Sequence, residues 1–179
     1  MRHRKLSMPE LKRVDIETFR QQPKRPIVLM LDNVRSLQNV GAMFRTADAF
    51  GIESLALCGI TGCPPHRELH NAALGAENSV AWQYFTSTEE AITHFRAEGY
   101  KILVLEQCEG SVLLNQVEFN IADKWVFVVG NEVDGVIQAV ASDADLCVEI
   151  PQCGTKHSLN VATAAGILLW EWRRFIDHA

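Results

Sequence analysis

Three short segments carry polar side chains of the kinds that bind phosphate, ribose or a cofactor. In the first, Asn39 and Arg45 stand among apolar residues that recur at helical spacing. In the second, Glu132 follows an apolar run and a glycine, and in the third Ser158 and Asn160 precede an alanine-rich stretch. A guanidinium binds phosphate through a fork of donors, and carboxylate, amide and hydroxyl groups can orient it.

Each segment also has an ordinary structural interpretation. Ser158 and Asn160 are residue types that cap helices, Arg45 could be a solvated helix residue, and residues 130–135 could form an acidic turn. However, open α/β sheets bind ligands just past the carboxyl ends of buried strands. Three such segments in one short chain therefore favour a shared site over separate caps and turns.

The elements that must position these segments alternate along the chain. Apolar runs predict buried strands, and apolar residues at helical spacing between polar or glycine boundaries predict helices. The expected strands are 27–31, 55–58, 80–85, 100–105, 125–129 and 146–150, and the expected helices are 39–50, 67–74, 87–97 and 160–175. Strands that alternate with helices predict an α/β fold with a parallel sheet.

Composition places limits on the class of protein. A chain of 179 residues with 47% hydrophobic residues is expected to form one globular domain. We expect a cytoplasmic protein, because the sequence shows neither a signal peptide nor an apolar stretch that could span a bilayer. No metal site is expected, since the spacing of Cys58, Cys63 and His66 does not fit a zinc ligand set.

Charge is distributed unevenly between the first 25 residues and the remainder. The net charge is −5, but residues 1–25 hold eight basic and three acidic residues, whereas residues 26–179 hold nine basic and nineteen acidic residues. A basic arm on an acidic body predicts an extension that contacts nucleic-acid phosphates. The alternative is a solvated tail, which basic runs also form.

The three segments resemble the motifs of a known enzyme family. Asn39-Val-Gly-Ala-Met-Phe-Arg45-Thr-Ala, Val129-Gly130-Asn131-Glu132-Val-Asp-Gly135, and Ile150-Pro151 through Ser158-Leu159-Asn160-Val-Ala-Thr-Ala are similar to those of the SpoU (TrmH-type) RNA 2′-O-ribose methyltransferases, a branch of the SPOUT superfamily. The resemblance covers residues 26–175. It implies a parallel sheet with helices on both faces, a C-terminal trefoil knot that binds S-adenosylmethionine, and a homodimer.

The resemblance also implies roles for individual residues. The expected catalytic residues are Arg45, Asn39, Glu132, Ser158 and Asn160, with Glu132 pairing with a guanidinium. From the resemblance, the expected cofactor-binding residues are Gly130, Ile150 and Leu159, to which the end of the expected strand 100–105 adds Leu105 and Glu106. The positive charge of the arm, which lies outside the resemblance, predicts that Arg2, Arg4, Lys5, Lys12 and Arg13 bind RNA, and Arg45 is expected to bind RNA as well. The arm would comprise residues 1–25 and the methyltransferase domain residues 26–179.

Assembly and substrate are open at this stage. The last expected helix carries apolar residues on several faces, including Leu169 and Trp170, and an exposed apolar face would be buried across a two-fold axis. The substrate could be transfer RNA or ribosomal RNA. Two other functions fit the same motifs: a non-catalytic RNA-binding module of this fold, and a SPOUT enzyme that methylates a base.

Overall fold

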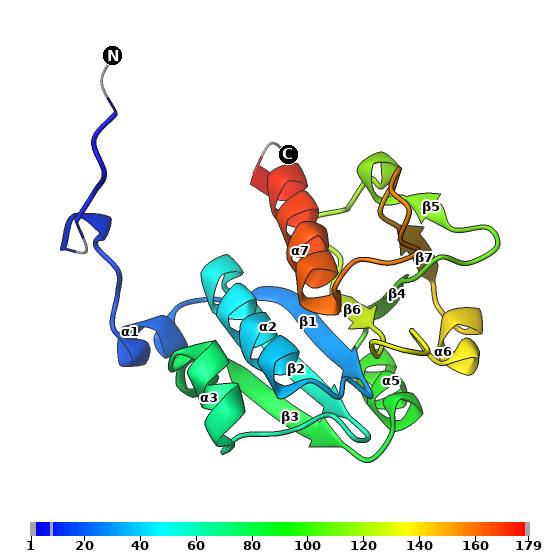
Figure 1. Cartoon of the computed structure of the whole chain (residues 1–179), viewed down its shortest axis with the longest axis horizontal. Helices are drawn as coiled ribbons and strands as arrows, with labels where there is room; N and C mark the ends of the chain where they lie inside the picture. The colour runs from blue at the N-terminus through cyan, green and yellow to red at the C-terminus, as the bar shows by residue number, and fades with distance from the viewer. Residues whose placement is uncertain (1–2, 8, 178–179) are drawn as a thin grey trace.

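The computed structural model describes residues 3–7 and 9–177 and is built on one seven-stranded sheet with the order β3-β2-β1-β6-β4-β7-β5 (Figure 1). All the pairings between its strands are parallel, which confirms the predicted fold class. The strands are β1 (Arg25–Asp32), β2 (Ile52–Cys58), β3 (Ala81–Phe85), β4 (Lys101–Leu105), β5 (Val112–Leu113), β6 (Trp125–Val129) and β7 (Leu146–Glu149).

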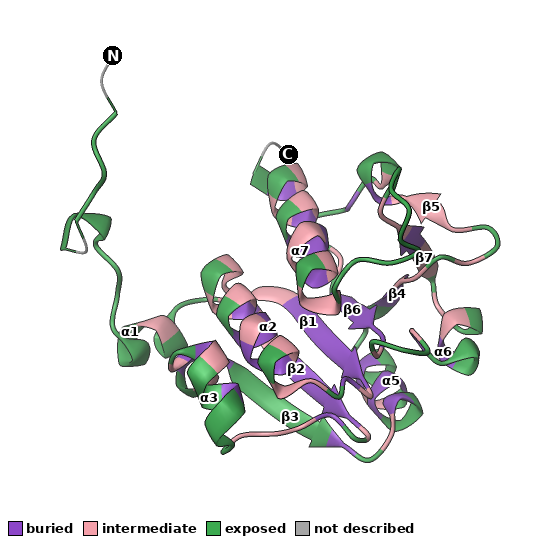
Figure 2. Ribbon diagram, viewed as in Figure 1, coloured by how far each residue is buried: buried purple, intermediate pink, exposed green. Residues whose placement is uncertain are grey.

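Helices cover both faces of the sheet, so the core has two layers (Figure 2). Alternate residues of β1 divide between them: Leu29 packs in one cluster and Val28 in the other. The first layer contains α2 (Leu37–Phe50), α3 (Arg67–Ala73), α4 (Ala76–Ser79) and α7 (Val161–Asp177). The second layer contains α5 (Thr88–Ala97) and α6 (Gln138–Ser142).

Side-chain caps set the starts of the helices that carry the motifs. Ser36 precedes α2 and accepts a hydrogen bond from the backbone N–H of Asn39. Asn160 precedes α7 and accepts from the N–H groups of Ala162 and Thr163. The third segment therefore opens a helix as predicted, but Asn160 alone caps it, and no cap hydrogen bond involves Ser158 among the described residues.

Strand β7 lies between two strands that precede it in the chain. Val148 of β7 is level with Leu105 at the end of β4 on one side and with Val112 at the start of β5 on the other. Residues 106–111, which connect β4 to β5, must therefore cross the path of the chain where it leaves β7. Sequence patterns missed β5 because a strand of two residues has no periodicity.

The N-terminal segment extends away from the body of the molecule (Figure 1). It contains a 3-10 turn, η1 (Pro9–Leu11), and a short helix, α1 (Ile16–Gln21), in which the half-buried Phe19 packs against the core. A second 3-10 turn, η2 (Leu114–Gln116), follows β5. Within residues 3–7 and 9–177, no helix is both long enough and apolar enough to cross a membrane.

The faces of α7 differ from the prediction at one residue. Ala165, Leu168, Leu169, Trp172 and Ile176 form the buried stripe of this helix. The sequence suggested that Leu169 belongs to an apolar face buried between two copies. In the structure Leu169 packs in the core of its own chain, so it cannot contact a second copy. Trp170 is the large apolar residue of α7 that faces outward, with 60% of its surface exposed.

Candidate functional site

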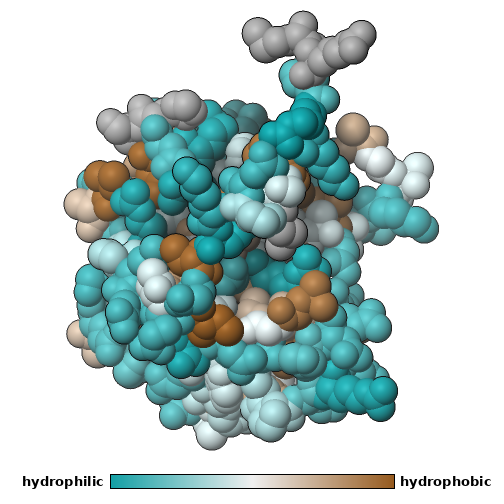
Figure 3. All heavy atoms as spheres, turned by 90° about the vertical axis from the view of Figure 1, so that its left-hand side faces the viewer, coloured by the Kyte–Doolittle hydropathy of each residue, from teal (hydrophilic) through white to brown (hydrophobic). Residues whose placement is uncertain are grey.

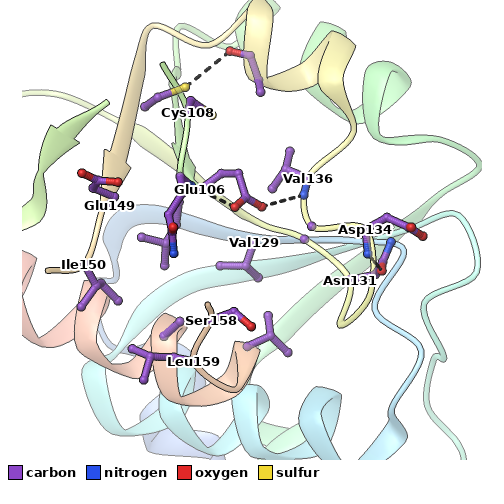
Figure 4. Close-up of a pocket in the computed structure, with 18 of the residues that line it drawn as sticks. Glu106, Cys108, Val129, Asn131, Asp134, Val136, Glu149, Ile150, Ser158 and Leu159 are labelled. Atoms are coloured by element: carbon purple, nitrogen blue, oxygen red, sulfur yellow. Dashed lines mark hydrogen bonds between the residues drawn. The ribbon is translucent and has the colours of Figure 1, made fainter. Parts of the chain in front are cut away.

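A pocket opens at the carboxyl ends of β4, β6 and β7 (Figure 4). Its volume is about 1000 Å³, which is large enough for a nucleoside-sized cofactor. Three connecting segments form most of its wall: residues 105–109, 129–136 and 157–161. The pocket thus lies where parallel α/β sheets bind their ligands.

The five residues that the sequence predicts to bind a cofactor all line this pocket: Leu105, Glu106, Gly130, Ile150 and Leu159. They come from three separate loops, which the crossing of the chain around β7 brings together. Backbone N–H groups of residues 152–159 donate to no other backbone group within the described chain. Such free groups suit a ligand that, like adenine, is recognised by short-range hydrogen bonds to the main chain.

The loop after β6 is a tight turn that leaves no room for a side chain at residues 130 and 135. The N–H of Asn131 donates to the carbonyl of Gly135 at 3.1 Å, and the N–H of Gly135 donates back at 3.2 Å. A Cβ on Gly130 would lie 2.0 Å from the backbone carbon of Gly135. Gly135 itself has a φ of +70°, and a Cβ there would lie 2.2 Å from Oε2 of Glu106. Both glycines are therefore required by the close return of this loop.

A chain of hydrogen bonds joins the three motifs beside the pocket. Oε1 of Glu132 accepts from Nδ2 of Asn39 at 2.7 Å, and Oδ1 of Asn39 accepts from Nδ2 of Asn160 at 3.1 Å. Glu132 also accepts from the backbone N–H groups of Arg35 and Ser36, at 3.2 and 3.1 Å. The amide of Asn39 is thus held in one orientation by an acceptor on one side and a donor on the other.

The carboxylate of Glu132 is held in its ionised form by these contacts. Partial burial acts to raise the pKa of Glu132, but the hydrogen bonds from Asn39 and from backbone N–H groups outweigh it, so the pKa is lowered. Within the described part of the chain Glu132 does not pair with a guanidinium, as the sequence led us to expect; its partners there are one amide and two backbone N–H groups. The geometry of the turn directs Glu132 toward the start of α2.

Two predicted catalytic residues stand apart from this network. Arg45 is exposed on α2 and does not line the pocket, and its side chain makes no hydrogen bond or ion pair within residues 3–7 and 9–177. Ser158 is exposed in the pocket wall, close to Leu159 (Figure 4). A single chain therefore brings together Asn39, Glu132 and Asn160, while the guanidinium of Arg45 faces solvent.

The predicted RNA-binding residues of the arm are spread along its exposed length. Arg4 forms an ion pair with Glu10 at 2.6 Å, whereas Lys5, Lys12 and Arg13 are exposed. Arg2 lies outside the described residues. Figure 3 shows that the side of the molecule facing the arm is largely hydrophilic, with hydrophobic side chains in small groups.

Sequence reasoning missed two residues that shape the site. Ser36 both caps α2 and donates its N–H to Glu132; a serine three residues before Asn39 was the available signal. Asp32 is fully buried at the end of β1, and an acidic residue directly after an apolar run could have drawn notice. Within the described chain, no group of three or more His, Cys, Asp or Glu side chains is placed to hold a metal ion.

Comparison with known proteins now identifies the family. The model of the SpoU rRNA Methylase family matches residues 26–170. The chain belongs to this family. The match spans all three motifs and most of the described domain, so the resemblance drawn from the motifs is confirmed.

Individual relatives agree with this membership. The chain is 30% identical over 149 residues to the 23S rRNA (guanosine-2'-O-)-methyltransferase RlmB of Neisseria meningitidis, covering 83% of this chain and 58% of that relative. It superposes on the crystal structure of an AdoMet-bound rRNA methyltransferase from Sinorhizobium meliloti with a TM-score of 0.79 and 32% identity, covering 87% of this chain and 59% of that one. The TrmH/SpoU tRNA modifying enzyme of A. aeolicus gives a TM-score of 0.80 at 26% identity, covering 91% and 83%.

Proposed function

We propose that this chain is an S-adenosylmethionine-dependent RNA methyltransferase that modifies a ribose 2′-hydroxyl of transfer or ribosomal RNA. The observation that carries the proposal is the hydrogen-bonded series Glu132–Asn39–Asn160, which joins three distant motifs beside a pocket of cofactor size. The N. meningitidis relative is named for guanosine 2′-O-methylation of 23S rRNA, and the S. meliloti structure is AdoMet-bound.

The pocket fits S-adenosylmethionine in size and in the groups that it offers. When bound, the cofactor supplies an electrophilic methyl group on a sulfonium. Backbone groups at Gly130, Ile150 and Leu159 would hold the adenine, because the close loop leaves the main chain accessible. The carboxylates of Glu106 and Glu149 line the same pocket and attract a cationic ligand.

Arg45 would act on the RNA and not on the cofactor. Its guanidinium offers a planar fork of N–H donors, so it would bind a phosphate and stabilise negative charge that develops on the ribose oxygen. Glu132 is poorly suited to be the base, because its lowered pKa and its three hydrogen-bond donors weaken its affinity for a proton. Glu132 and Asn160 instead orient Asn39 at the start of the helix that carries Arg45.

The two-part organisation, an arm of residues 1–25 and a domain of residues 26–179, belongs to the same proposal. Exposed Lys5, Lys12 and Arg13 would contact RNA phosphates. Deleting residues 1–22 should weaken RNA binding and reduce its salt dependence, because each lost phosphate contact lowers the slope by about 0.9 for duplex RNA or about 0.7 for single strands, as for DNA. Cofactor affinity, measured by calorimetry, is the control. An unchanged salt slope would assign RNA binding to the body alone.

The knot is proposed from the position of β7 between β4 and β5. Residues 106–111 cross the chain where it leaves β7, and α7 then returns to pack on α2. This path is what a threaded C-terminal segment requires. An experimental structure in which residues 150–160 pass outside the loop of residues 106–124 would contradict it.

The dimer is proposed from the outward face of α7. Trp170 stacks edge-on against the half-buried Phe50 of α2, with ring centroids 6.4 Å apart, yet remains 60% exposed. A second copy placed on this face would bury both rings. It would also extend the surface around Arg45, because Arg45 and Phe50 both lie on α2.

The decisive test is a map of 2′-O-methylated nucleotides in cellular RNA with and without the protein. The proposal expects at least one ribose methylation that disappears on deletion and is restored by purified protein with S-adenosylmethionine. A methylated base in the nucleoside digest would instead identify a base-modifying enzyme. RNA binding without cofactor binding in calorimetry would identify a non-catalytic module.

A further inference from the structure

Two carboxylates flank the end of β6 and follow directly on its neighbouring strands. In the sheet, β6 lies between β1 and β4. Leu31 of β1 and Leu105 of β4 are both level with Val129, the last residue of β6. Asp32 is the last residue of β1, and Glu106 is the first residue after β4. These two residues therefore stand on either side of the point where the chain leaves β6 and enters the turn of residues 130–135.

Each carboxylate accepts a hydrogen bond from the far end of that turn. Oε2 of Glu106 accepts the N–H of Val136 at 3.1 Å (Figure 4), and Oδ2 of Asp32 accepts the N–H of Ile137 at 2.9 Å. Adjacent backbone groups are thus held from opposite sides by two different strands. We call Asp32 and Glu106, with these two bonds, the two-carboxylate clamp.

The surroundings of Asp32 explain how a fully buried carboxylate is tolerated. Its Oδ1 accepts from Oγ1 of Thr88 at 2.6 Å and from Nδ2 of Asn33 at 2.8 Å, in addition to the Ile137 bond on Oδ2. Thr88 is the first residue of α5, so the helix N-terminus also favours negative charge there. A carboxylate built into such a set of donors holds its position firmly.

Between the two ends of the turn stands Glu132. The Asn131–Gly135 hydrogen bonds make the turn a compact unit, so fixing its far end at Val136 and Ile137 also fixes the direction of Glu132. Because a displacement of about 1 Å can cost about 100-fold in rate, the turn must be held as accurately as the residues that touch substrate.

We infer that Asp32 and Glu106 are positioning residues of the reaction: they clamp the turn of residues 130–137 so that Glu132 stays on Asn39. The expected effect on the rate of methyl transfer rests on the proposed function, whereas the effect on the position of the turn rests on the structure alone. The two residues differ in one respect, because Glu106 lines the cofactor pocket and Asp32 does not.

Asp32→Asn is the sharper test. Two donors face Oδ1 and one faces Oδ2, so the amide keeps its oxygen toward Asn33 and Thr88 and turns its NH₂ group against the N–H of Ile137. Amide exchange at Ile137 and through the turn should accelerate roughly 10- to 100-fold, as expected for loss of a hydrogen bond to a charged group. The kcat should fall about 10- to 100-fold, while the Kd for S-adenosylmethionine stays within about threefold.

A matched control removes a similar bond elsewhere. Oδ2 of Asp145 accepts the N–H of Ile102 at 2.7 Å, near the amino ends of the strands, so Asp145→Asn should leave both the turn and kcat unchanged. Glu106→Gln should change both cofactor affinity and kcat. If Asp32→Asn does not fold, Ile137→Pro removes the same hydrogen bond from the donor side, and the φ of −54° at Ile137 suits proline. In that variant amide exchange is followed at Asn131, Gly135 and Val136 in place of Ile137.

The outcomes separate the clamp from the proposed function. Faster exchange in the turn with a matching fall in kcat supports the positioning role. Unchanged exchange at Ile137, or faster exchange with unaltered kcat in an active enzyme, overturns it. If the unsubstituted protein methylates no RNA although Asp32→Asn loosens the turn, the proposed function fails and the role in catalysis falls with it, while the structural clamp stands.

Discussion

Glu132→Gln changes one atom in the network that joins the three motifs, and its effect can be worked out bond by bond. The carboxylate accepts Ser36 N–H and Asn39 Nδ2 on Oε1, and Arg35 N–H on Oε2. A glutamine has one acceptor oxygen, so its best orientation keeps the two bonds at Oε1 and points an NH₂ group at the N–H of Arg35. One hydrogen bond is lost, and the remaining two no longer have a charged acceptor.

Stability and activity should respond differently to this change. Glu132 is exposed, so water can replace the lost partner and the free energy of unfolding should fall by less than about 1 kcal/mol. For a domain of this size, that is a drop in Tm of less than about 4 °C. The bond to Asn39 is kept but its acceptor is no longer charged, so kcat should fall about tenfold, because a hydrogen bond to a charged group is worth about 1.5–3 kcal/mol and one between neutral groups about 0.5–1.5 kcal/mol.

The assay is single-turnover transfer of a labelled methyl group to an RNA that the unsubstituted protein modifies. Calorimetric titration with S-adenosylmethionine and thermal unfolding are run on the same samples. Asp134→Asn is a suitable control, since Asp134 lies in the same turn and, among the residues that the structure describes, its carboxylate makes only a 3.9 Å contact with Arg35. Transfer at the original rate in Glu132→Gln would refute the role of the network, as would a loss explained entirely by weaker cofactor binding.

Three further predictions follow from exposure and charge. Arg45→Ala should abolish transfer while sparing cofactor affinity, and Arg45→Lys should restore little activity because an ammonium lacks the planar fork; equal rates for Lys and Arg in the same assay would argue against phosphate recognition. Trp170→Glu should give a folded monomer by sedimentation, whereas Leu169→Ala should lower the free energy of unfolding by about 2–5 kcal/mol; a dimer that survives Trp170→Glu would place the interface elsewhere. The lowered pKa of Glu132 means that its contribution to stability is present above its ordinary value of 4.5 and is lost as pH falls through the lower folded value; carboxyl NMR should show a titration midpoint below 4.5 that rises in Asn39→Ala, and an unchanged midpoint in that variant would remove Asn39 as a cause.

Much of the sheet was predictable because its central strands are continuous apolar runs. Residues 125–129 and 102–104 are buried on both faces, which is the pattern of an inner parallel strand. Short elements without periodicity, such as β5 and α6, were missed for the opposite reason. The burial of Leu169 could have been predicted, since Ala165, Leu168, Leu169 and Trp172 recur at helical spacing. The prediction of an exposed apolar face instead used the apolar composition of the whole helix, which does not separate its inner face from its outer face.

The site could be predicted as a set of residues but not as a geometry. The five residues expected to bind the cofactor line one pocket, because the position of the motifs at strand ends determines which loops meet. The partners of Glu132 could not be found, because Arg35, Ser36 and Asn39 lie more than ninety residues away in the sequence. The clamp escaped notice for the same reason: Asp32 and Ile137 are brought together only by the strand order.

The placement of β7 has a consequence for how the protein is made. Because β5 pairs only with β7 among the described strands, it has no partner until the ribosome has synthesised the chain through Glu149. Residues 106–124 must therefore wait as an open loop while β1, β2, β3, β4 and β6 assemble. A chain truncated after residue 145 and released from the ribosome should be cut by protease within this loop, and full protection of the loop in that chain would contradict the order. Cofactor binding must also wait until the start of α7 has been synthesised, because Val161 and Ala164 of that helix line the pocket.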